Sequence, residues 1–159
     1  MTIRVRTADQ SDVDELLELW VALSADGHEA DDRYLIKPDA AATARTFIAR
    51  QWLVDCNYRV VVADAGTTIV GFMTARMAHP HHVLDAPPTA MITDAYVEPS
   101  HRRVGLGRQL FQAVRLWARD HDVEQLEVGT LALDTRAVGF WRSLGFGDWR
   151  IALARPTAP

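Results

Sequence analysis

The stretch MITDAYVEPSHRRVGLG, residues 91–107, decides the fold. Its first half is rich in apolar and β-branched residues and predicts a strand over Ala90–Val97 that ends before Pro99. Its second half leads into an amphipathic helix, because apolar residues recur at helical spacing from Leu106 to Ala118. A strand that turns into a helix start is an anion-binding arrangement, since free amides and the helix dipole both favour a phosphate there.

Two glycines, Gly105 and Gly107, open this helix start. Without a Cβ the backbone can approach a phosphate closely, so we expect both glycines to line it. Two other phosphate motifs do not fit. A dinucleotide fingerprint requires a third glycine where Leu110 stands, and a nucleotide P-loop requires Gly-Lys-Ser/Thr where residues 107–109 read Gly-Arg-Gln. Glycines before a helix also serve as turns and caps, so the glycines alone leave both readings open.

Outward from this stretch, residue spacing predicts a mixed order of strands and helices. The further elements expected are a strand over Ile3–Arg6, a helix capped by Asp9 or Ser11 and ending near Gly27, a polar loop over Asp26–Lys37, a helix over Asp39–Val54, hairpin strands over Tyr58–Ala63 and Thr68–Met77, a loop over His79–Pro88, a strand over Val123–Thr130, a helix over Arg136–Leu144 and a last strand over Asp148–Leu153. Hairpins combined with one strand-helix-strand crossover indicate an α/β fold of the α+β kind, a mixed sheet flanked by helices. With 159 residues and no repeat or linker, we expect a single domain over residues 1–159.

Charge is unevenly distributed along the chain. Ten acidic residues lie between Ala8 and Ala40, and five arginines lie between His101 and Asp120. This pattern fits either a cationic substrate beside an anionic cofactor or two solvated helix faces. The net charge of −4 argues against a general nucleic-acid binder.

The sequence also bears on the compartment. No apolar run is long enough for a membrane span, and the N-terminal residues lack the apolar core of a signal peptide. Cys56 is the single cysteine, which suits a reducing compartment. We therefore expect a soluble cytoplasmic protein that needs no disulfide and no membrane.

Two linked motifs resemble those of the GNAT superfamily of acetyl-CoA-dependent N-acetyltransferases. Residues 97–107 match its motif A, Arg/Gln-x-x-Gly-x-Gly/Ala after a strand that ends in Val-x-Pro. Residues 134–146 are similar to its motif B, Asn-x-x-Ala-x-x-Phe-Tyr-x-x-x-Gly-Phe. The order of elements above is also the family's order. The resemblance implies a mostly antiparallel mixed sheet that is splayed between its fourth and fifth strands, where the pantetheine arm of the cofactor enters.

The resemblance also implies which residues bind acetyl-CoA. It places the amide of Val97 on the pantetheine arm and the amides of the glycine loop on the pyrophosphate. Arg103 and Arg108 are added for their charge and proximity, with solvated arginines as the alternative. The expected cofactor-binding residues are Val97, Arg102, Arg103, Val104, Gly105, Leu106, Gly107, Arg108, Asp134 and Phe140.

Catalysis in this family needs a base, because an amine with a pKa of about 10.4 is mostly protonated near neutral pH. Asp94 and Tyr96 are the catalytic candidates on the strand. The alternative bases are Glu98, His28, His81 and His82. The histidines of the polar loop have no carboxylate or cysteine pair nearby, so we expect no metal.

Three positions depart from the family's pattern. Asp134 stands in place of the motif B asparagine, and Thr93 stands where many members carry a glutamate. Trp141 replaces the tyrosine that protonates the departing thiolate in many members, and helical spacing makes it a buried core residue instead. Strict alternation places Thr93 with Val97 on one face of the strand and Asp94 with Tyr96 on the other.

The function that these observations favour is direct acetyl transfer from acetyl-CoA to a primary amine of a small molecule or peptide. The acidic N-terminal region favours a cationic acceptor, whose identity the sequence does not give. A non-catalytic acyl-CoA-binding module is the alternative, because three motif positions differ from the family's pattern. Homodimers are common in the family, and the sequence leaves the oligomeric state open.

Overall fold

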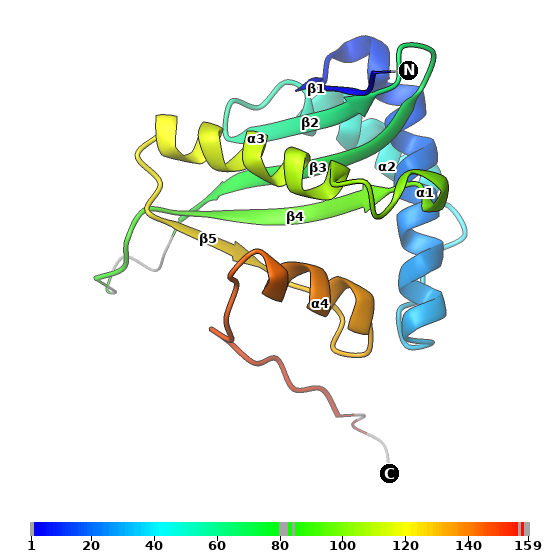
Figure 1. Ribbon diagram of the computed structural model, residues 1–159. Coiled ribbons are helices and arrows are strands. Elements are labelled where there is room, and N and C mark those ends of the chain that lie inside the picture. Colours follow the sequence, from blue (N-terminus) through cyan, green and yellow to red (C-terminus); the bar gives the residue numbers. More distant parts are fainter. Residues whose placement is uncertain (1, 80–82, 84, 156, 158–159) are drawn as a thin grey trace.

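A twisted sheet of five strands in the order β1-β2-β3-β4-β5 forms the centre of the molecule (Figure 1). The computed structural model describes residues 2–79, 83, 85–155 and 157. The first four strands pair antiparallel with their neighbours, whereas β4 and β5 are parallel. The strands are β1 (Arg4–Thr7), β2 (Tyr58–Asp64), β3 (Ile69–Ala78), β4 (Thr89–Val97) and β5 (Gln125–Val128). The predicted mixed, mostly antiparallel sheet is therefore confirmed.

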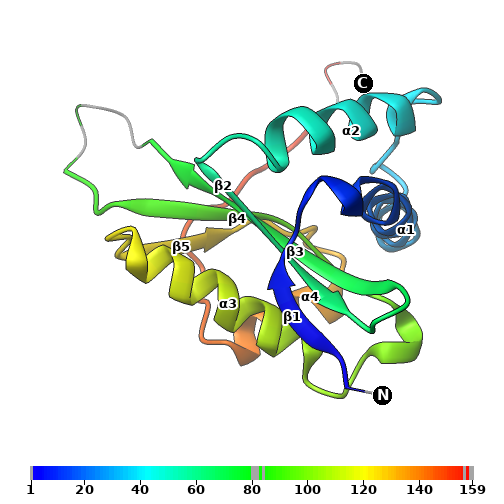
Figure 2. The same ribbon diagram turned by 90° about the horizontal axis from the view of Figure 1, so that it is seen from above.

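Helices cover both faces of this sheet (Figure 2). One face carries α1 and α2, and the other carries α3 and α4. The helices are η1 (Gln10–Asp12), α1 (Val13–Ala30), α2 (Ala40–Phe47), η2 (Ile48–Trp52), η3 (Pro99–His101), α3 (Leu106–Asp120) and α4 (Thr135–Ser143). The helix predicted over Asp39–Val54 is thus present, with its last part wound as a π-helix.

Each face of the sheet has its own apolar core. Val61 and Ala63 of β2 pack with Leu110 and Trp117 of α3, while the alternate residues of β2 pack against α1. Because both faces are covered, the central strands are apolar at nearly every position. The sheet is therefore packed between two layers of helices.

Helix α1 is longer than the sequence pattern predicted. Residues 26–30 belong to the helix, so the polar loop expected over Asp26–Lys37 begins only after Ala30. Gly27 lies within the helix, and its missing side chain leaves room for a neighbour: a Cβ there would lie 2.9 Å from the ring of Tyr34. At the other end Asp9 caps η1 as predicted, accepting from the amide of Ser11 at 2.8 Å.

The strand predicted over Asp148–Leu153 is absent, and that prediction is wrong for the single chain. No backbone hydrogen bond among the described residues involves residues 147–155. An alternating pattern forms a strand only where a neighbouring backbone completes the ladder. Here none does.

Candidate active site

The sheet is splayed between β4 and β5. The two strands pair over four positions only, from Thr89 opposite Gln125 to Ile92 opposite Val128. Beyond Ile92, the rest of β4 pairs with β3 alone. Since the amide of Glu98 donates to the carbonyl of Val70 on β3, the preceding amide, that of Val97, points to the splayed side. The predicted splay is thus present.

A β-bulge at Thr93 lies where the β4–β5 pairing ends. Thr74 of β3 faces Asp94, and the next residue of β3, Ala75, faces Ile92, so Thr93 is the extra residue. The bulge breaks the strict alternation of side chains between the two faces of β4 that the sequence predicts. Ile92 packs in the α3 core, as Val97 does four positions after the bulge. Thr93 was expected on the face of Val97, and that expectation is wrong.

The bulge gathers three polar side chains on the α1 face of the sheet. The buried hydroxyl of Thr74 lies 2.5 Å from that of Thr93 and donates to Asp94 at 3.1 Å. Burial raises the pKa of Asp94, and the hydrogen bonds from the two threonines oppose this rise. Burial, and to a lesser extent the charge of Asp94, raises the pKa of Tyr34, which follows α1. Asp94 is therefore a partly buried carboxylate whose proton affinity is above normal.

The start of α3 presents free backbone amides. Gln109 is the first residue of the helix whose amide donates to a backbone carbonyl, that of Gly105 at 3.1 Å. The amides before it, from Leu106 to Arg108, belong to the unpaired first turn of a helix. Arg103 and Gly105 both have positive φ, 67° and 89°, which turns the loop so that it ends in this set of donors.

The two glycines of this loop differ in surroundings. No atom lies within 4 Å of the position that a Cβ on Gly105 would take, so the loop faces open space there. A Cβ on Gly107 would instead meet the ring of Phe140 at 3.0 Å. Gly107 thus lets α3 approach α4, whereas the backbone at Gly105 is open to an approaching ligand.

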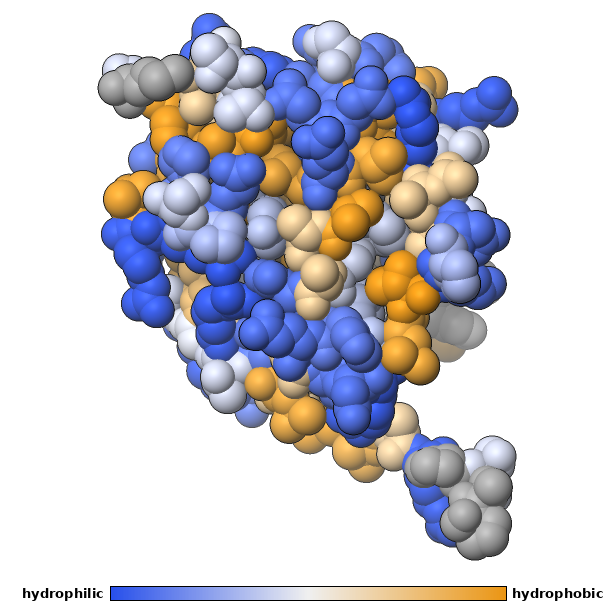
Figure 3. Space-filling model, turned by 90° about the vertical axis from the view of Figure 1, so that its right-hand side faces the viewer, coloured by the Kyte–Doolittle hydropathy of each residue, from blue (hydrophilic) through white to orange (hydrophobic). Residues whose placement is uncertain are grey.

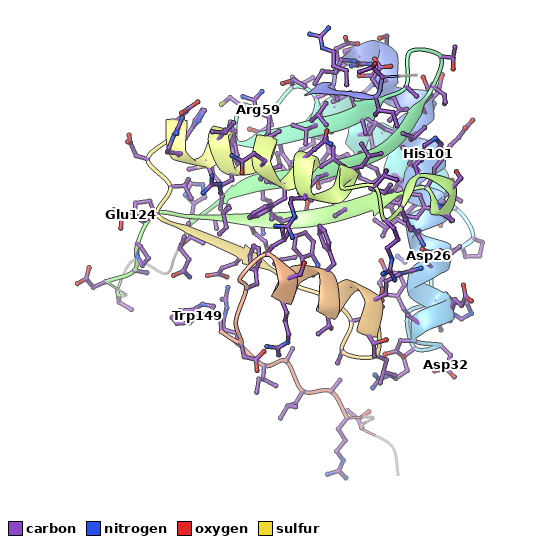
Figure 4. All side chains as sticks on the ribbon, viewed as in Figure 1. Asp26, Asp32, Arg59, His101, Glu124 and Trp149 are labelled. Atoms are coloured by element: carbon purple, nitrogen blue, oxygen red, sulfur yellow. The ribbon has the colours of Figure 1, made fainter. Side chains whose placement is uncertain are left out.

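Arg102 is committed to protein partners. Its Nε donates to the carbonyl of Val97 at 2.6 Å, and an Nη lies 2.9 Å from the carboxylate of Asp26 on α1. Arg136 of α4 reaches the same carboxylate at 2.9 Å. The guanidinium of Arg102 also lies 5.2 Å from the ring centre of Tyr96. Figure 4 shows Asp26 on α1 beside the loop that follows β4.

The other predicted residues have different surroundings. Leu106 is buried in the α3 core, so its amide alone is available at the helix start, whereas Val104, Arg103 and Arg108 are exposed. The carboxylate of Asp134 caps α4 by accepting from the amide of Ala137 at 2.9 Å. This contact occupies the side chain that the resemblance places near the cofactor.

Trp141, at the motif B position where many members carry a tyrosine acid, and Tyr96 of β4 are both buried. Trp141 packs between Phe140 and Phe146, with ring centres 4.8 and 5.5 Å away, which confirms it as a core residue. Tyr96 packs in the core on the α1 face, and burial raises its pKa.

The remaining candidate bases lie elsewhere. Glu98 is 3.3 Å from His101, and His28 contacts the carbonyl of Tyr34 at 3.2 Å. His81 and His82 are outside the described residues. Within the described part of the chain, no group of histidine, cysteine and acidic residues is arranged to hold a metal ion, and no helix is long and apolar enough to cross a membrane.

Three side chains of the site were not found from the sequence. Asp26 stood only as one of ten acidic residues, Arg136 only as part of motif B, and Thr74 was not singled out. Their partners are far away in the chain, 110 residues for Asp26 and Arg136, so no local spacing signals the contact.

Comparison with known proteins agrees with this architecture. The model of the acetyltransferase (GNAT) family matches residues 14–146. An aminoglycoside N(6')-acetyltransferase type 1 of Stenotrophomonas maltophilia is 32% identical over 101 residues, covering 62% of this chain and 65% of that relative, just under two thirds of its length. A mycothiol acetyltransferase of Pseudarthrobacter chlorophenolicus is 28% identical over 134 residues, 83% of this chain and 39% of that protein.

The fold itself is matched by solved structures. The aminoglycoside N-acetyltransferase AAC(6')-Iy, solved with the bisubstrate analogue CoA-S-monomethyl-acetylneamine, superposes with a TM-score of 0.75 at 21% identity and covers 99% of this chain and 100% of that one. The family match extends over most of the chain and includes the splayed strands and the glycine loop, and the chain therefore belongs to the GNAT family of acetyltransferases.

Proposed function

We propose that this protein transfers the acetyl group of acetyl-CoA directly to a primary amine of a small, cationic molecule, with Asp94 as the base. One observation carries the proposal: the bulge that bears Asp94 begins the segment of β4 that has no partner on its β5 side, and the loop after this segment leads to the free amides at the start of α3. A phosphate site and a base are thus joined by a strand edge that can hold an extended ligand.

The cofactor is assigned to the α3 side of this edge. Its pyrophosphate lies on the amides of Val104, Gly105 and Gly107, where the helix dipole favours negative charge. Its pantetheine arm follows the splayed edge of β4 and bonds the amide of Val97. Arg103 and Arg108, exposed and without a protein partner in the described chain, supply the nearby positive charge. Arg102 holds the loop in place through Val97 and Asp26.

The reaction is a direct acyl transfer. Asp94 takes a proton from the ammonium group, directly or through water, and the neutral nitrogen attacks the thioester carbon. The carbon–sulfur bond then breaks and its electron pair leaves on sulfur, a thiolate whose conjugate acid has a pKa of about 8.5. The second proton of the attacking nitrogen passes to this thiolate or to water as the amide forms. A backbone amide of β4 stabilises the negative charge that develops on the carbonyl oxygen.

A cationic amino sugar is the acceptor class that we propose. Relatives are named aminoglycoside N(6')-acetyltransferases, and such substrates carry several ammonium groups. Asp94 lies toward the α1 side, where Asp32 and Glu29 have no ion pair among the described residues. We further propose that the protein acts in the cytoplasm, because an exposed free thiol at Cys56 suits a reducing compartment.

The cofactor assignment is tested by replacing a glycine whose conformation matters. Gly105 and Gly66 both have a φ of 89° and no atom near their Cβ positions, so Ala strains the two sites equally, by about 1–2 kcal/mol. Gly66 lies in the β2–β3 hairpin. We expect Gly105→Ala to weaken acetyl-CoA binding about tenfold or more, a loss of about 1.4 kcal/mol, and Gly66→Ala to leave it unchanged. Equal affinities by calorimetry in folded variants would remove the assignment.

The activity is tested by following CoA release with a panel of aminoglycosides, polyamines, amino acids and peptides. Release with an aminoglycoside supports the acceptor class. Release with another amine alone keeps the transfer reaction and rejects the acceptor. If CoA binds but no amine releases it, the chain is an acyl-CoA-binding module and the enzymatic proposal fails.

A further inference from the structure

A cavity separate from the proposed active site lies between α3 and the first two strands of the sheet. It has a volume of about 300 Å³, and Thr7 of β1, Arg59 of β2 and Trp117 of α3 are among the residues that line it. Figure 4 shows Arg59 near the C-terminal half of α3, on the other side of the molecule from Asp26. The face over α1, which Figure 3 turns to the viewer, is largely hydrophilic with scattered apolar patches. The cavity lies on the α3 side of the sheet, and its residues take no part in the proposed acetyl transfer.

The guanidinium of Arg59 has unused hydrogen-bond donors at this cavity. Its Nη1 donates to the hydroxyl of Thr7 at 3.1 Å. Its Nε is buried without a partner in the described part of the chain, and Nη2 has no partner there either. Nε and Nη2 together form the edge of a guanidinium that binds a carboxylate through two parallel hydrogen bonds. Buried donors are rarely left unpaired in folded proteins, so this edge is suited to an acceptor that the chain itself does not supply.

Trp117 adds a second donor at the same cavity. The side chain is only 6% exposed, and its indole Nε1 has no hydrogen-bond partner among the residues that the structure describes. This nitrogen is not shielded from solvent, unlike Nε of Arg59. The guanidinium carbon of Arg59 lies 5.9 Å from the centre of the Trp117 ring. Since an indole N–H can only donate, both side chains offer donors to one ligand.

The charges around the cavity favour a ligand with a single negative charge. Arg59 has no acidic partner in the described chain. Arg6 is already paired with two aspartates, and Asp120 lies 3.3 Å from Arg119. The last carbonyls of α3 accept hydrogen bonds from residues 121–123, so the negative end of the helix is satisfied by the chain. One unbalanced cation fits a monoanion better than a doubly charged phosphate.

We propose that this cavity binds a small monocarboxylate with an apolar tail. The carboxylate accepts hydrogen bonds from the free edge of Arg59 and from the indole N–H of Trp117. Because Nε is shielded from solvent, the guanidinium turns this edge toward the ligand on binding. The tail lies against the apolar wall of the cavity, which Val5, Val61 and Ala113 form. This site is independent of the proposed acceptor and of acetyl transfer.

The first test follows the indole N–H signals of the five tryptophans by NMR while butyrate is added to the full chain. The variant Trp117→Phe identifies the signal of Trp117. We expect butyrate to shift this signal, with saturation, and to leave the other four in place. Butyramide, which has the same shape and no charge, should have no effect. A Trp117 signal that butyrate does not move, or that butyramide moves equally, overturns the proposal, and tighter binding of inorganic phosphate rejects the monocarboxylate class.

The second test measures butyrate affinity by calorimetry in variants whose fold is checked by circular dichroism. Arg59→Lys keeps the charge but loses the planar edge, so binding should weaken about tenfold or more. Arg59→Met removes charge and donors and should abolish binding. Arg115→Gln is the control, because Arg115 is an exposed arginine on the same helix as Trp117, and its loss should leave the affinity unchanged. Unchanged affinity in Arg59→Met, or equal weakening in Arg115→Gln and Arg59→Lys, rejects the site.

Discussion

At the scale of single residues, the environment of Asp94 gives the clearest link from structure to chemistry. The carboxylate is partly buried beside two hydroxyl groups, and burial raises its pKa. A base with raised proton affinity accepts a proton from an ammonium group more readily than a solvated aspartate does. The same burial disfavours the charged form in the folded state, so function and stability oppose each other here.

Removal of the carboxylate should abolish most of the activity. We expect Asp94→Asn to lower kcat about 100-fold or more and to remove the acidic limb of the pH profile of kcat/KM. Glu98→Gln is the control: its side chain pairs with His101, and its loss should keep both the rate and the limb. An acidic limb that persists in Asp94→Asn and disappears in Glu98→Gln would transfer the role to Glu98.

The stability of the same variant should change in the opposite direction. Because the folded-state pKa of Asp94 is above its unfolded value of about 3.9, the folded protein loses stability as the pH rises through the interval between the two. Asp94→Asn removes this loss. We expect a higher Tm than wild type at pH 7 and equal Tm values below the unfolded pKa, as measured by calorimetry.

The presence of Trp141 in place of a tyrosine leads to a prediction for the pH dependence of kcat at high pH. An indole donates no proton at neutral pH, so kcat should rise to a plateau without a fall at high pH. Trp141→Phe should keep kcat within about tenfold, where loss of a true general acid costs about 100-fold or more. A descending limb in an enzyme that remains folded, absent from Tyr96→Phe, would instead identify Tyr96 as the acid.

At the scale of elements, the bulge in β4 is the feature that builds the site. It lies one residue beyond the last β4–β5 pair, and bulges bend a strand and increase its twist. The bend carries the end of β4 away from β5 and brings Thr93 and Asp94 to one side. The bulge therefore accounts both for the open edge of β4 that is assigned to the cofactor and for the position of Asp94.

Deletion of Thr93 tests this cause. Without the extra residue, Ile92 and Asp94 keep their partners on β3 and the ladder becomes regular. We expect a folded protein in which β4 runs closer to β5, with acetyl-CoA binding lost by calorimetry. Thr93→Ala keeps the bulge and should keep binding. If the deletion variant binds the cofactor like the wild type, the bulge does not make the splay.

Much of the element order could be predicted from the sequence, because apolar spacing, caps and turn residues are local. The GNAT family and the mixed sheet are confirmed. The predictions failed where contacts outside the local pattern decide the structure. Alternation cannot reveal the bulge at Thr93, which depends on pairing with β3, and Gly27 serves to admit the ring of Tyr34 and lies within α1. The strand over Asp148–Leu153 has the right pattern but no neighbour in its own chain.

At the scale of the whole molecule, the carboxylates of the acidic region Ala8–Ala40 are less available to a ligand than its composition suggests. Several of its carboxylates bind the protein itself, as Asp12 does with Arg6, Asp14 with Arg45 and Asp31 with Arg33. Only the remaining ones can attract a ligand by charge. Figure 4 shows Asp32 and Glu124 at opposite ends of the molecule. The effect of removing negative charge at one end can therefore be compared with its removal at the other.

This comparison leads to a prediction for the dependence of kcat/KM on ionic strength. Glu29→Gln with Asp32→Asn should lower kcat/KM for a polycationic acceptor and flatten its decrease with ionic strength, because exposed charges act through a screened field. Asp120→Asn with Glu124→Gln removes the same charge at the other end and should change neither. Identical salt profiles for the two double variants would show that the acidic region is only a solvated surface.

The carboxylate of Asp26, which pairs with both Arg102 and Arg136, also links the motions of three segments. It joins the last part of α1 to the loop before α3 and to the first turn of α4, so the opening of any one of the three breaks at least one of these ion pairs. Amides in these segments should therefore exchange with deuterium as one cooperative unit, with a common opening free energy. In Asp26→Asn each segment should open at its own rate.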